Sequence, residues 1–284
     1  MGRACPRGRP ARGPQPPDGT SAPIREPAPL NPAVKLFNSV LKRTKLYKSL
    51  NEDLDTIKSI LAQQGIRQTL QDGSVFSLPN ATEDLIQKRI FFTKTYYELN
   101  VLTTLQSLIP PQARIVDVGA NIGNHSVFFA RQCGAASIHA FEALESTFQI
   151  LQQNIALNGL SDIITPHNLA LSNAVGRAAV AHHSQHNIGS TSLEAREQGT
   201  IETGTLDGFN LPGIDFLKID VEGFELNVLE GAERSIARSK PLIAIETFGD
   251  QLPRVEAFLG AFGYTCTHRL ESQNYVFAAD ADRP

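Results

Sequence analysis

The amino-acid sequence predicts an α/β fold built on a mostly parallel, doubly wound sheet. Five apolar runs of strand length alternate with segments whose apolar residues recur every three or four positions, which is the pattern of repeated strand–helix units. The first run ends in a glycine-containing turn, and the last two short runs follow one another with no helical pattern between them. The core is therefore expected to have right-handed crossovers and a closing antiparallel hairpin.

The elements of this core are expected in a regular order. Strands are predicted at 114–119, 137–142, 163–171, 214–220 and 241–246. Helices are predicted at 122–132, 144–157, 226–232 and 255–262, and the hairpin at 264–270 and 274–279.

The chain of 284 residues is expected to fall into three parts. Residues 1–32 hold nine of its 17 prolines and little apolar surface, so they are predicted to form a disordered Pro/Arg-rich tail. Residues 33–73 are predicted to form a helical accessory segment with a basic first half, ending in a hairpin turn at Asp72-Gly73. Residues 74–284 form the predicted main domain.

Composition narrows the class of protein. The 26 Lys and Arg residues against 29 Asp and Glu, a net charge of −3, argue against a nucleic-acid partner. Cys5, Cys133 and Cys266 are too few and too far apart for a disulfide framework or a four-cysteine zinc site. No apolar run approaches the ~20 residues of a membrane helix. We expect a cytoplasmic protein with no transmembrane segment, and a homo-oligomer is left open.

In doubly wound sheets, ligands bind beyond the carboxyl ends of the strands. The first predicted strand ends in Asp-Val-Gly-Ala-Asn-Ile-Gly-Asn (117–124), where Gly119 and Gly123 permit a tight turn and close approach of a ligand. Asn121 and Asn124 stand where a dinucleotide fingerprint would have its second and third glycines. The turn therefore favours a ligand without a pyrophosphate bridge.

Acidic residues end two further strands of the predicted sheet. Glu142 ends the second strand, where its carboxylate can accept hydrogen bonds from the two hydroxyls of a ribose. Asp220, Glu222 and Glu225 follow the fourth strand, with Gly223 allowing an abrupt turn between them. The favourable effect of acids at a helix N-terminus explains Glu225 better than it explains Asp220. Together these features indicate an adenosyl ligand with carboxylates beside it.

These motifs resemble those of one family of proteins. Val-Asp-Val-Gly-Ala-Asn-Ile-Gly (116–123), Thr-Leu-Asp (205–207) and Phe-Leu-Lys-Ile-Asp-Val-Glu-Gly-Phe-Glu (216–225) are similar to motifs of the FkbM S-adenosylmethionine-dependent methyltransferases. Supporting pieces are Tyr97-Glu98, Phe141-Glu142, Asn-Leu-Ala-Leu-Ser (168–172) and Ile245-Glu246. The resemblance spans roughly residues 74–279, and the Lys-Ile-Asp-Val-Glu-Gly block is its most specific part.

The resemblance implies a class I (Rossmann-like) methyltransferase with a seven-stranded sheet and an antiparallel last strand. It also implies S-adenosylmethionine as cofactor and methyl transfer to a hydroxyl of a sugar, a glycan or another small-molecule natural product. The implied cofactor-binding residues are Asp117, Gly119, Ala120, Asn121, Gly123, Asn124, Glu142, Asn168 and Ala170. The implied substrate and catalytic residues at the cleft mouth are Tyr97, Glu98, Ser190, Thr191, Asp220 and Glu222.

Methyl transfer to an alcohol benefits from a base that takes the hydroxyl proton. Asp220 is the first candidate for this base, Glu222 the second and His125 the third. Asp220 and Glu222 could instead hold Mg²⁺, but the sequence shows no third ligand, so the metal is unresolved.

Three alternatives are set against this reading. His182, His183 and His186 could chelate zinc, although they have no clear companion ligand and a loop or substrate contact is favoured. A non-catalytic S-adenosylmethionine or nucleotide-binding module would not need the carboxylates after the fourth strand. An NAD-dependent oxidoreductase should show the full three-glycine fingerprint.

Overall fold

The computed structural model describes residues 48–49, 52–53, 66–182, 192–195, 198–249, 251–271 and 273–280. The chain divides into two units, Met1–Asp55 and Thr56–Pro284. The predicted tail 1–32 and most of the predicted helical segment 33–64 lie outside the described residues. Of the first unit only Lys48–Ser49 and Glu52–Asp53 are described, and they are helical.

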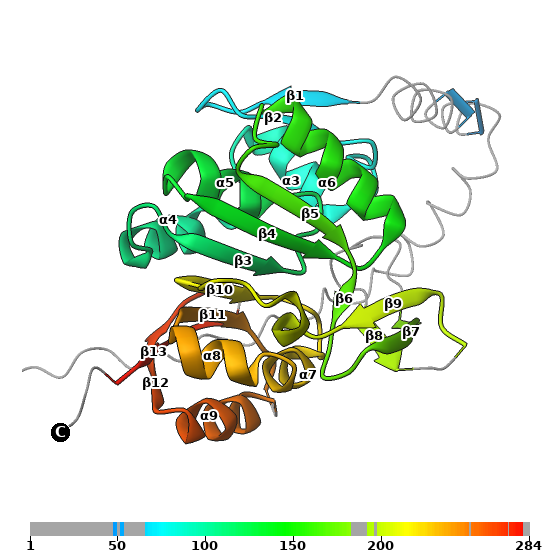
Figure 1. Ribbon diagram of the computed structural model, residues 1–284. Helices are drawn as coiled ribbons and strands as arrows, with labels where there is room; N and C mark the ends of the chain where they lie inside the picture. The colour runs from blue at the N-terminus through cyan, green and yellow to red at the C-terminus, as the bar shows by residue number, and fades with distance from the viewer. Residues whose placement is uncertain are drawn as a thin grey trace, which may run out of the picture. The chain divides into compact units, whose positions relative to one another are not determined.

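The second unit is built on a seven-stranded sheet, which confirms the predicted fold class. Its strand order is β12-β13-β11-β10-β3-β4-β5 (Figure 1). The strands are β3 (Arg114–Val118), β4 (Ser137–Glu142), β5 (Ile164–Asn168), β10 (Phe216–Ile219), β11 (Leu242–Glu246), β12 (Tyr264–Arg269) and β13 (Asn274–Ala279). β13 runs antiparallel to both its neighbours, β11 and β12, and the other pairs of the sheet are parallel, as the closing hairpin predicted.

Helices cover both faces of this sheet because successive strand residues are apolar on both sides. Ile115 of β3 belongs to a core with α3 (Leu85–Thr93), α4 (Leu99–Leu108), α5 (Asn124–Gln132) and α6 (Glu145–Leu157). The next residue, Val116, belongs to a second core with α7 (Glu225–Glu230), α8 (Glu233–Ser239) and α9 (Leu252–Ala261). Figure 1 shows these two groups of helices on opposite sides of the sheet.

The structure differs from the prediction at one strand and at one helix. The single strand expected at 163–171 is two, β5 and β6 (Ala170–Leu171), because the chain leaves the central sheet after Asn168. β6 joins β7 (Gly176–His182), β8 (Ser192–Ala195) and β9 (Ile201–Gly204) in a separate sheet ordered β6-β9-β7-β8, followed by a 3-10 helix, η2 (Leu206–Phe209). The helix expected at 226–232 is α7, which ends at Glu230 with Gly231 as its C-cap residue, and a second helix that was not predicted, α8, follows it. A Cβ on Gly231 would lie 1.9 Å from the carbonyl oxygen of Ser172, so the backbone segments at these two residues are too close for any residue but glycine at position 231.

The predicted hairpin at Asp72-Gly73 is present. β1 (Arg67–Thr69) and β2 (Val75–Ser77) pair antiparallel around this turn, where Gly73 has a φ of 84°. The side chain of Asn154 in α6 accepts a 2.7 Å hydrogen bond from the backbone N–H of Ser77, which fixes the hairpin against the helix. The predicted boundary between accessory segment and main domain falls in this turn and stays a prediction.

Candidate active site

A pocket of about 490 Å³ opens at the carboxyl ends of β3, β4, β10 and β11. β3 and β10 are neighbours at the centre of the sheet, and the strand order reverses direction between them. This is the switch point at which open α/β sheets bind ligands. The pocket therefore lies at the strand ends where the sequence motifs led us to expect a ligand.

Ten of the predicted site residues line this pocket. On the side of β3 and β4 these are Gly119, Ala120, Asn121, Asn124, Glu142 and Ala170. On the side of β10 and α4 they are Tyr97, Glu98, Asp220 and Glu222. Residues that the prediction had assigned to different parts of the ligand are thus brought together around one cavity.

The turn from β3 into α5 is built on left-handed backbone conformations. Gly119, Asn121 and Gly123 have φ values of 76°, 51° and 89°. A Cβ on Gly119 would lie 1.8 Å from the carbonyl oxygen of Asp220, so glycine is required for the two strand ends to approach. Asn121 tolerates the same region, and its side-chain oxygen accepts a 2.7 Å hydrogen bond from the N–H of Ile122.

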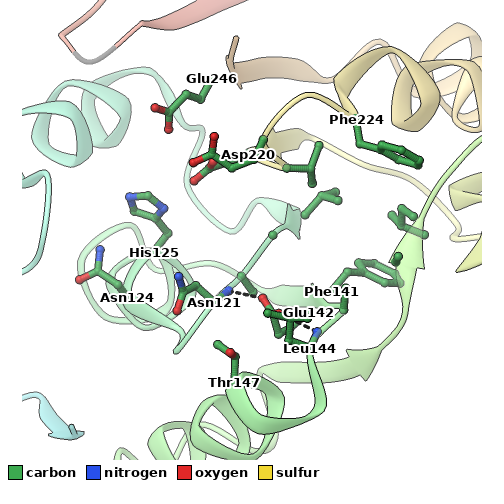
Figure 2. Close-up of a pocket in the computed structure, with 18 of the residues that line it drawn as sticks. Asn121, Asn124, His125, Phe141, Glu142, Leu144, Thr147, Asp220, Phe224 and Glu246 are labelled. Atoms are coloured by element: carbon green, nitrogen blue, oxygen red, sulfur yellow. Dashed lines mark hydrogen bonds between the residues drawn. The ribbon is translucent and has the colours of Figure 1, made fainter. Parts of the chain in front are cut away.

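Glu142 is held at one side of the pocket by the backbone. Its Oε2 accepts a hydrogen bond from the N–H of Asn121 and its Oε1 accepts one from the N–H of Leu144, both at 2.9 Å (Figure 2). The side chain is buried, and this burial raises the pKa of Glu142 to about 7 despite the two hydrogen bonds. Each carboxylate oxygen keeps a lone pair for a further donor, which fits the two hydroxyls of a ribose.

Three predicted cofactor contacts lie outside the pocket lining. Gly123 is the N-cap residue of α5, and its φ of 89° is a left-handed conformation that favours glycine. Asn168 donates a 3.0 Å hydrogen bond to the backbone oxygen of Glu142 and so supports that residue from behind. Asp117 is fully buried beneath the pocket. These residues shape the site through their neighbours.

Asn124 lines the pocket, but its amide is already in use. Its Oδ1 accepts a 3.0 Å hydrogen bond from the N–H of Tyr97, and its Nδ2 donates a 3.1 Å hydrogen bond to the carbonyl oxygen of Tyr97. Asn124 therefore fixes the backbone that carries Tyr97 and Glu98, the predicted substrate residues.

Lys218 in β10 contacts two residues of the pocket lining, Gly119 and Asp220, and the sequence analysis assigned it no role. Its ammonium group is buried and lies 3.2 Å from Asp117 Oδ1, 3.3 Å from Asp220 Oδ2 and 3.1 Å from the carbonyl oxygen of Gly119. Burial alone would lower the pKa of Lys218, but the two carboxylates outweigh it and raise the pKa above its usual value. A lysine inside an apolar strand was the signal that could have identified it.

The opposite side of the pocket carries carboxyl groups from three elements. Asp220 and Glu222 follow β10, Glu246 ends β11, and Glu98 is the N-cap residue of α4. Burial, followed by the charge of Asp220, raises the pKa of Glu222 to about 7. Glu98 and Glu222 both have a left-handed backbone, with φ values of 55° and 50°, which is costly for a residue with a side chain.

His125, the third predicted base, lies in α5 beside Glu98 with its Nε2 3.7 Å from the Glu98 carboxylate. Its ring stacks on Phe129. Burial and then the charge of Lys218 lower the pKa of His125 to about 4, so the ring is neutral at pH 7.

Metal binding has no structural support in the described part of the chain, where no group of three His, Cys, Asp or Glu side chains is arranged to hold an ion. His183, His186, Ser190 and Thr191 lie outside the described residues, and only the backbone of His182, in β7, is described. Within the described ranges, no helix combines the length and apolarity needed to cross a bilayer.

The strand order, the glycine-containing turn after β3 and the buried acid at the end of β4 define a class I methyltransferase of Rossmann-like fold. The model of the FkbM methyltransferase domain matches residues 117–266, more than half of the chain. The protein therefore belongs to the FkbM methyltransferase family, as the sequence motifs indicated. A fold of this class implies use of S-adenosylmethionine.

Curated relatives and a solved structure are similar to this chain. "Methyltransferase 1" of Beauveria bassiana is 27% identical over 195 residues, which cover 58% of this chain and 74% of that protein. "Methyltransferase sdnD" of Sordaria araneosa is 25% identical over 232 residues, which cover 68% of this chain and 86% of that protein. The FkbM methyltransferase crystal structure from Methylobacillus flagellatus is 18% identical with a TM-score of 0.48, and the match covers 78% of this chain and 57% of that one.

Proposed function

We propose that this protein transfers the methyl group of S-adenosylmethionine to a hydroxyl oxygen of a sugar or another small natural product. One observation carries the proposal: Glu142 and the carboxylates of Asp220 and Glu222 line a single pocket at the switch point of the sheet. The first provides a ribose contact, and the others provide bases beside it.

The cofactor half of the proposal is supported by the walls around Glu142. Its two oxygens would accept the ribose hydroxyls, and the turn at Gly119 and Asn121 would carry the methionine part along the backbone. Leu144 and Ala170 give an apolar surface for the adenine ring. S-adenosylmethionine supplies a methyl group that its sulfonium already activates, so the protein's task is to align the accepting oxygen. Such alignment can contribute ~7–11 kcal/mol to catalysis.

The acceptor half rests on Asp220 and Glu222. When the acceptor oxygen bonds to the methyl carbon, the carbon–sulfur bond breaks and the hydroxyl proton must leave. Asp220 would take this proton, because its carboxylate lines the pocket and the ion pair with Lys218 fixes it in place. Glu222 is the second candidate, since a base whose pKa lies near 7 is half ionised at neutral pH.

Calorimetric titration with S-adenosylmethionine, S-adenosylhomocysteine and NAD tests the cofactor half. We expect both S-adenosyl compounds to bind, NAD not to bind, and Glu142→Ala to abolish binding. Glu145→Gln is the matched control, because Glu145 is an exposed glutamate three residues further on, at the start of α6, and the change should leave binding intact. Binding of NAD alone would contradict the proposal.

Asp220→Asn then separates an enzyme from a binding module. Retained cofactor binding with lost turnover supports the base assignment. Unchanged turnover would remove Asp220 from this role.

A further inference from the structure

Glu246, at the end of β11, lies directly beside Asp220. Ile219 of β10 pairs in parallel register with Ile245 of β11, so the residues that follow them, Asp220 and Glu246, emerge side by side from neighbouring strands. Adjacent strands are ~4.8 Å apart. Both residues line the pocket, and Figure 2 shows their carboxyl groups in the same part of it, near His125.

Two carboxyl groups that share one part of a pocket do not readily ionise together, because each negative charge disfavours the other. Lys218 forms ion pairs with Asp117 at 3.2 Å and with Asp220 at 3.3 Å. Glu246 thus faces the negative charge of Asp220 without the same ion pair. Of the two carboxyl groups, Glu246 is therefore the one expected to carry a proton.

The other charged groups around Glu246 act in the same direction. Glu98 approaches it from the N-terminus of α4 and Glu222 from the turn after β10, and only Lys218 opposes them. Burial first, and then Asp220 and Glu98, raise the pKa of Glu246 to about 9. The carboxyl group is neutral at pH 7 and is a hydrogen-bond donor.

We infer that Glu246 is a specificity-determining residue, which donates a hydrogen bond to a second oxygen of the acceptor while Asp220 takes the proton of the reacting hydroxyl. This rests on the proposed function. The preferred acceptor then carries two neighbouring oxygens, as in a vicinal diol. Glu246 keeps its proton throughout, so the only proton that moves is the one from the hydroxyl to Asp220.

The protonation of Glu246 is tested by ¹³C NMR titration of the full chain with labelled glutamate carboxyl carbons. The Glu246 resonance is the one missing from Glu246→Gln. We expect its midpoint near pH 9, and a lower midpoint in Asp220→Asn because a neighbouring negative charge is gone. The control Glu256→Gln, a partly exposed carboxyl on α9 outside the pocket, should leave the resonance unchanged. A midpoint below pH 6, or one that Asp220→Asn does not move, would overturn the inference.

The donor role is tested with cis-cyclohexane-1,2-diol and cyclohexanol as acceptors, following S-adenosylhomocysteine release. We expect kcat/KM for the diol to exceed that for cyclohexanol by about tenfold or more, the effect of one hydrogen bond. Glu246→Ala should remove this preference, and Glu246→Gln, whose amide still donates, should keep it. Wild-type rates with the diol should fall as the pH rises through 9, and Glu246→Gln should lose that fall.

Equal rates for the two alcohols, or a preference that survives Glu246→Ala, would contradict the donor role. The NMR titration requires no acceptor. If the protein methylates no hydroxyl at all, the proposed function fails, whereas the midpoint of Glu246 still decides where the proton of the pair resides.

Discussion

The two sides of the pocket are built in different ways. On the cofactor side, Glu142 is fixed by two backbone N–H groups and the turn at Gly119 follows from close chain packing. On the acceptor side, Glu98 and Glu222 have a strained backbone, and Asp220 and Glu246 carry neighbouring carboxyl groups. The cofactor side is thus held by backbone hydrogen bonds and close packing, whereas the acceptor side combines two glutamates of left-handed backbone with neighbouring carboxyl groups, features that binding and catalysis would explain.

Lys218→Met should have the largest effect on stability, because the Lys218 ammonium group contacts both sides of the pocket, Gly119 on one and Asp220 on the other. The change leaves Asp117 buried beside Asp220 with no cation, and breaking a buried ion pair costs about 3–5 kcal/mol of unfolding free energy. Urea denaturation measures this loss. Lys94→Met, at an exposed position, is the control and should change stability little. A loss below about 1 kcal/mol for Lys218→Met would show that the network is not structural.

Glu222→Gly tests whether the strain on the acceptor side serves activity. Glycine relieves a φ of 50°, so the unfolding free energy should stay the same or rise by up to about 1 kcal/mol. Methyl transfer should fall by about 100-fold if Glu222 is a base.

Lys94→Gly is the matched control, since Lys94 has a φ of 55° at an exposed position outside the pocket. It should gain the same stability and keep full activity. If Glu222→Gly also keeps full activity, the difference between the two sides is not functional.

Asn124→Ala separates a cofactor contact from support of the acceptor side. Because the amide holds the Tyr97 backbone by two hydrogen bonds, its loss should cost about 2 kcal/mol of unfolding free energy and raise KM for the acceptor. Affinity for S-adenosylmethionine, measured by calorimetry, should change little. A selective loss of cofactor affinity would return Asn124 to the cofactor side.

The pH dependence of cofactor binding should be the smallest effect. Burial raises the pKa of Glu142 to about 7, so the carboxyl is mostly protonated at pH 6 and mostly ionised at pH 8. Ribose hydroxyls donate to the ionised form, and affinity should therefore rise about tenfold from pH 6 to pH 8. Glu142→Gln should remove this rise in calorimetric titrations. An affinity that falls over this range would contradict the assigned role of Glu142.

The two sides of the pocket also differ in how much of them local sequence patterns can predict. The strands of the seven-stranded sheet, with its closing hairpin, and Glu142 follow local patterns and were predicted close to their observed positions, whereas β7, β8 and β9 of the smaller sheet were not predicted. The double hydrogen bond between Asn124 and Tyr97 joins residues 27 positions apart, and no local pattern encodes it.

The break between β5 and β6 escaped prediction for a similar reason. Residues 163–171 were predicted as one strand, and the exit from the central sheet is set by pairing of β6 with the distant β9. That Asp220 and Glu246 follow neighbouring strands likewise depends on strand order, which sequence periodicity does not specify.

Transfer of a ¹³C-labelled methyl group from S-adenosylmethionine to a panel of polyhydroxylated acceptors, followed by NMR of the products, tests the central claim most directly. The account predicts that the label appears as a methoxy carbon and that Asp220→Asn greatly reduces its formation while cofactor binding persists. A label found on nitrogen or carbon, or one that never leaves S-adenosylmethionine across the panel, would contradict it.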